Sequence, residues 1–174
     1  MPNIYHYLRD LQYSFRVTNK AIASGLFLGL ITSLGPAAIS QAQSFEALAN
    51  RTRQTTAKVT LANLNKAQQL YYTQHGKFAA SIAQMSVGIN PNTNDFRYQT
   101  LPLGNQTQMV MMNAIAKRLG VRSYTGAVSA IKNNRGSTTV TIICETVSPS
   151  SKPPARPIRN RTGQLACAAG SRPI

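Results

Sequence analysis

One amphipathic stretch, residues 57–78, constrains the fold of this chain more than any other part of its sequence. Apolar side chains recur there at steps of three and four residues, at Ala57, Leu61, Leu64, Ala67 or Gln68, and Tyr71. This spacing places them on one face of an α-helix and predicts that the face packs on the rest of the domain. Polar side chains such as Lys58 and Asn65 are expected on the opposite side. The helix is predicted to end at Gly76, because glycine readily adopts the left-handed conformation that closes a helix.

The segment before this helix, from Ser44 onward, is also predicted to be helical but is too polar to belong to a core. Ser44 is placed to cap its first turn, and Glu46 lies where the helix dipole favours an anion. Neither glycine nor proline separates the two segments, which predicts one element of about thirty residues, roughly 45 Å long. We therefore expect residues 43–56 to form a projecting helical stem and residues 57–174 to form a head domain.

The first 42 residues are predicted to be an export signal. Residues 1–20 are polar and basic, residues 21–35 carry no charge, and Pro36 interrupts the apolar run before several small residues. These are the parts of a secretory signal peptide, and the small residues predict cleavage between Ala42 and Gln43. A degenerate membrane segment over residues 21–42, in contact with the membrane, is the competing interpretation. In either case the protein is expected to be periplasmic, on the cell surface, or anchored in the inner membrane and facing the periplasm.

Four segments with strand character follow the helix and predict an antiparallel sheet. They are residues 96–101, 108–115, 123–131 and 138–147, where β-branched and alternating apolar side chains are frequent. The stretch 132–137, which contains Asn and Gly, has the composition of a hairpin turn. Residues 108–115 fit a short helix as well, and residues 163–169 are candidates for a short edge strand. With the long helix, these segments predict the α+β class.

The two cysteines, Cys144 and Cys167, frame a basic, proline-rich loop. In an exported protein a disulfide between them is favoured over two unconnected buried thiols, and two thiols alone make a poor zinc site. Closing this loop would stabilise the fold by about 3 kcal/mol in the chain-entropy description. The loop carries four cationic side chains that are candidates for anion binding: Lys152, Arg156, Arg159 and Arg161.

The charge balance indicates an anionic partner or a dispersed basic surface. Lysine and arginine number 19 against 4 acidic residues, which gives a formal net charge of +15. Such an excess attracts DNA, an acidic polysaccharide or a lipid surface, although the cations are scattered along the chain.

Catalytic constellations are scarce in this sequence. With so few carboxylates, a hydrolytic site would need His75 and Asp95 to converge, and His75 at a helix end is more typical of a surface or capping residue. No phosphate-binding glycine loop and no nucleophile elbow is present. The sequence therefore predicts a protein that is not an enzyme and has no cofactor and no metal.

The residues that join the stem to the head resemble those of type IV pilins, specifically the bacterial pilin-like G and H group, which is similar to general secretion pathway pseudopilins. In that group an Asn-Leu-Asn-Arg/Lys-Ala-Gln-Gln-x-Tyr-Tyr run is followed by Gly-Lys-Phe. The matching positions here are Asn63, Leu64, Asn65, Lys66, Ala67, Gln68, Gln69, Tyr71, Tyr72, Gly76, Lys77 and Phe78. Weaker similarity to the same group continues through residues 123–128 and 138–145 to the last cysteine.

This resemblance implies a pilin-like fold, in which a long N-terminal helix packs on a four-stranded antiparallel sheet and a disulfide bounds a C-terminal loop. It implies a structural subunit or minor component of a type IV pilus or a type II secretion pseudopilus, with other pilin-like subunits or the secretion machinery as partners. The alternative is an exported surface module whose basic loop binds DNA or an acidic polysaccharide.

The N-terminal residues depart from the family pattern. Pilins carry a Gly-Phe-Thr-Leu-x-Glu type of motif at the site of prepilin cleavage, and no such motif is present here. In an alignment without gaps, the glutamate position falls near Leu26 and Ile22 replaces the aromatic residue. Because that carboxylate pairs subunits in the family, its absence predicts a pilin-like head that is exported by a general signal and works outside an ordinary filament.

Overall fold

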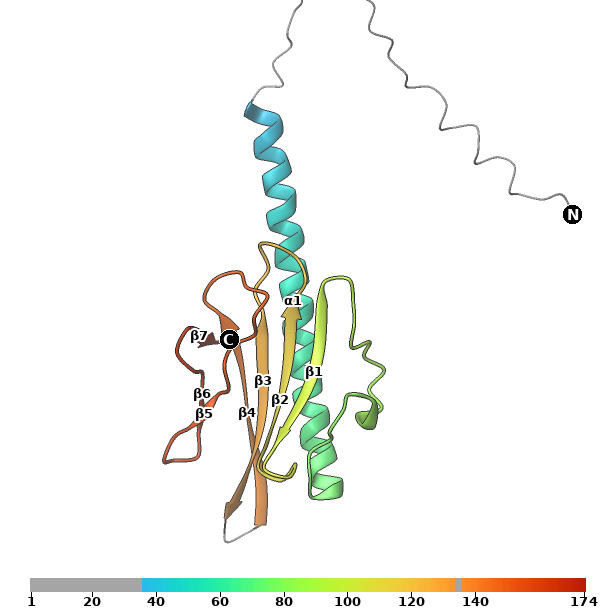
Figure 1. Cartoon of the computed structure of the whole chain (residues 1–174), viewed down its shortest axis with the longest axis vertical. Helices are drawn as coiled ribbons and strands as arrows, with labels where there is room; N and C mark the ends of the chain where they lie inside the picture. The colour runs from blue at the N-terminus through green and yellow to red at the C-terminus, as the bar shows by residue number, and fades with distance from the viewer. Residues whose placement is uncertain (1–35, 134–135) are drawn as a thin grey trace, which may run out of the picture. The chain divides into compact units, whose positions relative to one another are not determined.

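The computed structural model describes residues 36–133 and 136–174 (Figure 1). One helix, α1 (Pro36–His75), is followed by a short 3-10 helix, η2 (Ala83–Met85). The remaining elements are the strands β1 (Phe96–Leu103), β2 (Met109–Ala116), β3 (Tyr124–Asn133), β4 (Gly136–Thr146), β5 (Ile158–Arg159), β6 (Leu165–Ala166) and β7 (Ser171–Pro173). The sequence predicts the export signal over residues 1–42, and residues 1–35 of that segment lie outside the described residues.

Helix α1 is continuous over 40 residues and combines the predicted stem with the predicted packing helix. It begins at Pro36 and not at Ser44, since proline suits the first turn of a helix. Ser44 instead lies inside the helix and its hydroxyl donates to the carbonyl of Gln41. At the other end, Gly76 has φ 66° and its N–H donates to the carbonyl of Tyr72, so the helix ends where the sequence predicts. The N-terminal part of α1, blue in Figure 1, extends past the ends of the strands.

The main sheet is antiparallel and has five strands, in the order β1-β2-β3-β4-β7. The four predicted strands are present, and residues 109–116 form a strand that is paired on both sides. The hairpin expected at 132–137 is consistent with the pairing of Asn133 with Gly136, while residues 134–135 themselves are outside the described part.

The main sheet has a fifth strand, β7, where the sequence predicts four. The edge strand expected within residues 163–169 is not part of this sheet. Cys167 is bonded to Cys144, so the residues before it are held near β4, and β6 pairs only with β5. The chain reaches the free side of β4 after Gly170, which has φ 80°, and residues 171–173 then pair with Cys144–Thr146. The constraint is tertiary and leaves no local pattern in the sequence.

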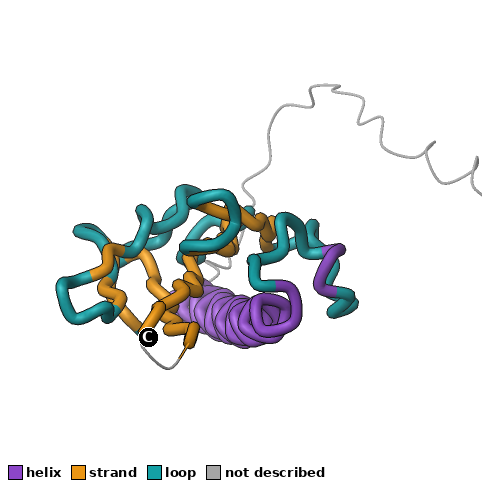
Figure 2. Tube along the Cα trace, turned by 90° about the horizontal axis from the view of Figure 1, so that it is seen from below, coloured by secondary structure: helices purple, strands orange, loops and turns teal. Residues whose placement is uncertain are grey.

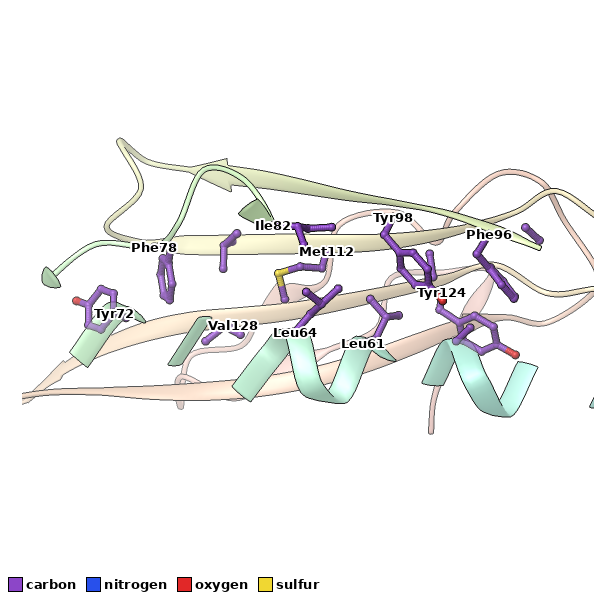
Figure 3. Close-up of a cluster of buried hydrophobic side chains, with 14 of the residues drawn as sticks. Leu61, Leu64, Tyr72, Phe78, Ile82, Phe96, Tyr98, Met112, Tyr124 and Val128 are labelled. Atoms are coloured by element: carbon purple, nitrogen blue, oxygen red, sulfur yellow. The ribbon is translucent and has the colours of Figure 1, made fainter. Parts of the chain in front are cut away.

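The hydrophobic core lies between α1 and one face of the sheet, the helix face (Figure 3). Ala57, Leu61 and Leu64 are fully buried there against side chains such as Met112 and Tyr124. The prediction for Tyr71 is wrong: Tyr71 is half-buried outside the core and stacks on His75 with ring centroids 4.2 Å apart. Tyr72 is the buried tyrosine and packs on Phe78, because the step of four from Gln68 keeps it in line with Leu61 and Leu64.

Two polar residues of α1 are buried on the helix face as well. Asn65, expected on the polar side, is 4% exposed and lies over Gly126, where a Cβ atom would stand 2.7 Å from its Oδ1. The amide of Gln68 donates to the carbonyl of Ala79 and accepts from the N–H of Ala79, at 3.1 and 2.9 Å. The Nδ2 of Asn65 donates to the carbonyl of Ile142 at 3.3 Å, while its Oδ1 has no hydrogen-bond partner among the described residues. The two bonds of Gln68 and the one of Asn65 favour a single register of the helix on the sheet, because a shift would leave more buried amide groups without partners.

The opposite face of the sheet, the loop face, is covered by the C-terminal loop. Thr125 donates through its hydroxyl to the carbonyl of Pro154, and Ser123 donates to the carbonyl of Ser150. The predicted disulfide between Cys144 and Cys167 is present, with Cα atoms 5.7 Å apart. In Figure 2, seen along the helix, strands lie along one side of α1 and loops lie beyond them. The head is thus built of three layers: helix, sheet and loop.

Candidate assembly surface and basic groove

A second apolar stripe runs along α1 on the side that faces away from the sheet. It consists of exposed side chains, Phe45 at 70%, Leu48 at 62%, Val59 at 55% and Leu70 at 59% of their full accessibility. At about 100° per residue, their separations of 3, 11 and 11 residues place them within a sector of about 60°, so they share one face. At about 100° per residue, this face lies opposite the stripe of Leu61 and Leu64.

Small and polar residues lie between the exposed apolar side chains of this outer stripe. At steps of three and four, Thr52 and Thr55 lie between Leu48 and Val59, and Asn63 and Lys66 lie between Val59 and Leu70. The part from Phe45 to Val59 has the composition that allows another helix to approach closely and bury the larger side chains. Sequence reasoning missed this stripe because the stem is polar on average, although the spacing of its few apolar residues was a usable signal.

Ion pairs hold α1 to the head at the end where the stem emerges. Arg53 of α1 contacts Asp95, 3.3 Å from Nε to Oδ1, and also Glu46 at 3.0 Å. Arg118 contacts the same oxygen of Asp95 at 3.3 Å. These contacts connect the helix to the two loops that flank the start of β1 and the end of β2.

Glu145 of β4 is the buried acidic residue of this junction. Its carboxylate lies 2.7 Å from Arg172, 3.5 Å from Lys58 and 3.9 Å from Arg122, and its side chain is 5% exposed. Burial by itself raises the pKa of the Glu145 carboxyl, but the hydrogen bond from Arg172 and the charges of Lys58 and Arg122 outweigh it. The net pKa is therefore below the ordinary value, and the carboxylate stays charged in the fold.

The neighbouring phenol of Tyr124 is perturbed in the opposite direction. Burial, reinforced by the charge of Glu145, raises the pKa of Tyr124 to about 12, while Arg122 acts against this rise. Its hydroxyl lies 3.2 Å from Oε1 of Gln54 on α1 and donates a hydrogen bond to it. Tyr124 is thus a neutral structural contact between helix and sheet.

The four cationic residues predicted for the loop are all exposed but do not form one patch. Arg156 and Arg159 line a groove of about 840 Å³, which we call the basic groove, and Lys132 of β3 joins them. Lys152 lies in a separate hollow with Lys117 and Arg118, and Arg161 lines neither. The anion-binding role of these four residues stays a prediction, and the structure places them at different hollows of the surface.

The lining of the basic groove combines polar and apolar residues, and no acidic side chain is present among the described residues that line it. Its apolar residues include Leu103, Met109 and Ile131. The guanidinium of Arg159 donates to the hydroxyl of Ser129 and to the carbonyl of Ala130, which are neutral groups and leave its charge uncompensated. The groove is therefore suited to an anionic group attached to an apolar body.

The structure does not bring His75 and Asp95 together. His75 stacks on Tyr71 beside a groove of α1 and η2, whereas Asp95 is held by Arg53 and Arg118 beside another. Within residues 36–133 and 136–174, no group of three or more metal-binding side chains is present. The hydrolytic pair of His75 and Asp95 that the sequence leaves open is therefore not formed.

A search for membrane-spanning helices finds none among the described residues that is long and apolar enough to cross a bilayer. In comparisons with known proteins, the model of one family, type IV pilin-like G and H, matches residues 54–168. No curated protein and no solved structure matches the chain. The matched range begins in the packing half of α1 and ends just after the second cysteine of the disulfide.

Proposed function

The chain belongs to the type IV pilin-like G and H family, and from this premise we propose that it is a structural subunit that assembles with other pilin-like subunits. Family members are generally structural and not enzymatic. The finer proposal is a subunit or minor component of a type IV pilus or a type II secretion pseudopilus. The observation that carries it is the outer stripe of α1, which exposes four large apolar side chains in line.

The outer stripe supports assembly because its own chain leaves it uncovered. Burial of apolar surface contributes about 25 cal/mol for each Å². Association is therefore favoured once several such side chains pack together. The head keeps α1 fixed through Asn65, Gln68 and the ion pairs of Arg53, so the stripe is presented on a rigid element. A rigid helix lowers the entropy lost when subunits pack.

The test is site-specific photo-crosslinking in cells that express the full chain. A photoreactive residue at Val59, on the outer stripe, is expected to form cross-links to another pilin-like chain. The matched control is Val147, a valine of similar exposure, 52%, in the loop after β4. Equal cross-linking from both positions, or none from Val59, would contradict the proposal.

A pair of acidic substitutions gives an independent measurement of the same surface. Val59→Asp is expected to abolish incorporation into assemblies isolated from cells, because a carboxylate would be desolvated between helices. Val147→Asp is expected to leave incorporation unchanged. Both variants should keep the thermal unfolding midpoint of the parent, since both side chains are exposed.

The family and the disulfide together indicate a location outside the cytoplasm. The finer proposals concern residues 1–42: export by a general signal cleaved between Ala42 and Gln43, or a retained membrane segment over residues 21–42. Mass spectrometry of the mature N-terminus separates them. A chain that starts at Gln43 supports cleavage, and a chain that retains residues 21–42 supports the anchor.

A second candidate function, polyanion binding, is favoured by the basic groove. Three cations with no acid in the lining would hold phosphate or carboxylate groups of DNA or an acidic polysaccharide. Retention on immobilised DNA should fall steeply with salt, and Arg156→Ala should lower the slope of log affinity against log salt by about 1. Lys77→Ala, which removes an exposed cation that does not line the groove, is the control. Equal slopes for both variants would remove this function.

A further inference from the structure

The two edges of the five-stranded sheet are protected to different degrees. At the β1 edge, residues 91–93 exchange backbone hydrogen bonds with Phe96 and Tyr98, at 2.9 and 2.7 Å, and Pro102 has no N–H to offer. At the opposite edge, β7 pairs only with Cys144–Thr146, the last three residues of β4. Uncovered strand edges recruit further strands, so natural proteins usually cover them or place charges and prolines on them.

The direction of the unpaired backbone groups on β4 follows from the hydrogen bonds at its end. Ile174 donates to the carbonyl of Ile143, so Ile143 faces away from β3, whereas Thr146 donates to the carbonyl of Ser123, so Thr146 faces the sheet. Consecutive residues of a strand alternate in this direction. The groups that face outward without a backbone partner in the described residues therefore belong to Ser137, Thr139 and Thr141.

This open edge has the composition of a strand that accepts another. Residues 136–144 contain no charge and no proline, and Thr138 and Thr141 are exposed. The pairing of β7 extends to the hydrogen bond from Ile174 to the carbonyl of Ile143, and no described residue pairs with the outward groups of β4 before Ile143.

A hollow of about 500 Å³ lies beside the open edge, between β4 and the end of α1. It is lined by Tyr72, Thr73, Gly76, Lys132, Ser137, Thr138 and Thr139. Among the described residues that line this hollow, Lys132 is the charged one and none is acidic. A strand added to β4 would point alternate side chains toward α1, because the side chains of a strand alternate between the two faces of a sheet.

We propose that the open edge of β4, residues 137–142, binds an extended acidic segment of a partner protein by strand addition. Backbone hydrogen bonds to Ser137, Thr139 and Thr141 supply the pairing, and a carboxylate in the hollow pairs with Lys132. The proposal does not use the outer stripe of α1, and it shares only Lys132 with the basic groove, so its pairing through the backbone of β4 is distinct from the proposed assembly and polyanion functions.

A second copy of this chain is a poor occupant of the edge. Each copy carries a formal net charge of +15. Its described acidic residues, Glu46, Asp95 and Glu145, are already engaged in ion pairs within the head and stem. A copy therefore offers no free acidic strand to Lys132, and repulsion between two such charges opposes pairing.

The test uses the full disulfide-bonded chain and a heptapeptide in which valine alternates with glutamate. We expect binding in fluorescence anisotropy, about tenfold weaker binding of the version with glutamine in place of glutamate, and no binding of the lysine version. Bound peptide should slow hydrogen exchange at the amides of Ser137, Thr139 and Thr141. Absence of binding by all three peptides, or equal binding of the lysine version, overturns the proposal.

Variants of the edge separate strand addition from simple charge attraction. Thr141→Pro removes an outward N–H at an edge position that tolerates proline and should weaken binding at least about tenfold, whereas Thr141→Ala should change it less than about twofold. Lys132→Ala should abolish the preference for glutamate over glutamine. Equal affinities of the Thr141 variants, or an unchanged preference in the Lys132 variant, would contradict the proposal.

Two further measurements test the backbone pairing without a change in the protein and test whether a second copy occupies the edge. Methylation of alternate amide nitrogens of the peptide removes the pairing without changing the protein, so it should weaken binding as Thr141→Pro does, even if that variant is poorly folded. Sedimentation of the chain without peptide should show no dimer that Thr141→Pro dissociates. Such a dimer would assign the edge to a second copy and overturn the proposal.

Discussion

The two faces of the main sheet are covered by opposite physical means. On the helix face, Leu61 and Leu64 of α1 pack on Met112 and Val128 in an apolar core. On the loop face, β3 presents small polar side chains, such as Thr125, that are buried and donate to carbonyls of the C-terminal loop. The helix is held by burial of apolar area, and the loop is held by hydrogen bonds and one disulfide.

This difference shows which parts of the head should respond to which conditions. Apolar burial does not depend on redox state and depends little on pH, whereas the loop buries few apolar side chains, Pro154 and Pro157 among them, and therefore relies more on its covalent closure. The helix face should therefore determine whether the domain folds. The loop face should determine whether the loop stays in place.

The largest effect is expected from truncation of the helix face. Leu61→Ala should lower the free energy of unfolding by about 2 to 5 kcal/mol, because it leaves a cavity in a fully buried site. Leu70→Ala, the same truncation on the outer stripe, should change it by less than about 0.5 kcal/mol. Urea unfolding measures both. Similar losses would mean that the two faces of α1 are not distinct.

Removal of the disulfide is expected to rank second. The free energy of unfolding of the double variant Cys144→Ala with Cys167→Ala should be about 3 kcal/mol lower than that of the parent. Hydrogen exchange should become faster in residues 148–166, while amides of α1 that face the sheet stay protected in native conditions. Loss of protection in α1 as well would show that the loop also holds the helix face.

The third prediction concerns Glu145, where the helix, β4 and β7 meet. Its folded pKa lies below the ordinary value of 4.5, so the stability it contributes is present above pH 4.5 and is lost as the pH falls through the folded pKa. Glu145→Gln should lower the free energy of unfolding by about 2 kcal/mol at neutral pH. This is less than the loss expected when a fully buried ion pair is broken, because the cationic partners of Glu145 are partly exposed.

The pH dependence provides the check on that prediction. The parent should lose stability below pH 4.5 more steeply than the Glu145→Gln variant, as measured by urea unfolding at several pH values. Glu46→Gln, at an exposed ion pair of the stem, should cost less than about 0.5 kcal/mol at neutral pH. Parallel pH profiles for the parent and Glu145→Gln would assign the acid sensitivity to other groups.

The smallest effect is expected on the loop face itself. Thr125→Val should lower the free energy of unfolding by about 1 kcal/mol, because it removes the one hydroxyl hydrogen that is available to the carbonyl of Pro154 and Oδ1 of Asn113, each 2.9 Å from the hydroxyl oxygen. Thr138→Val, at an exposed strand position, should stay within about 0.5 kcal/mol of the parent. If Thr125→Val is neutral, hydrogen bonds do not hold the loop and the comparison of the two faces fails.

The stripe of Ala57, Leu61 and Leu64, the stop at Gly76 and the four main strands follow from the sequence alone. Each of these features is local: a spacing of three and four, a glycine that accepts φ 66°, or alternation along a strand. The pairing of Cys144 with Cys167 also followed, since an exported chain with two cysteines offers one partner for each. The motif around Tyr71 and Tyr72 indicated the family that matches residues 54–168.

Other features were decided only by the tertiary structure. Which of Tyr71 and Tyr72 enters the core depends on the accumulated rotation of a long helix against the sheet, and a single residue step changes it by about 100°. Asn65 is buried because Gly126, far away in sequence, leaves room for it. The basic residues of the loop disperse because Thr125 and Ser123 hold the loop flat on the sheet. In each case the outcome depends on a contact between distant residues, which local patterns do not encode.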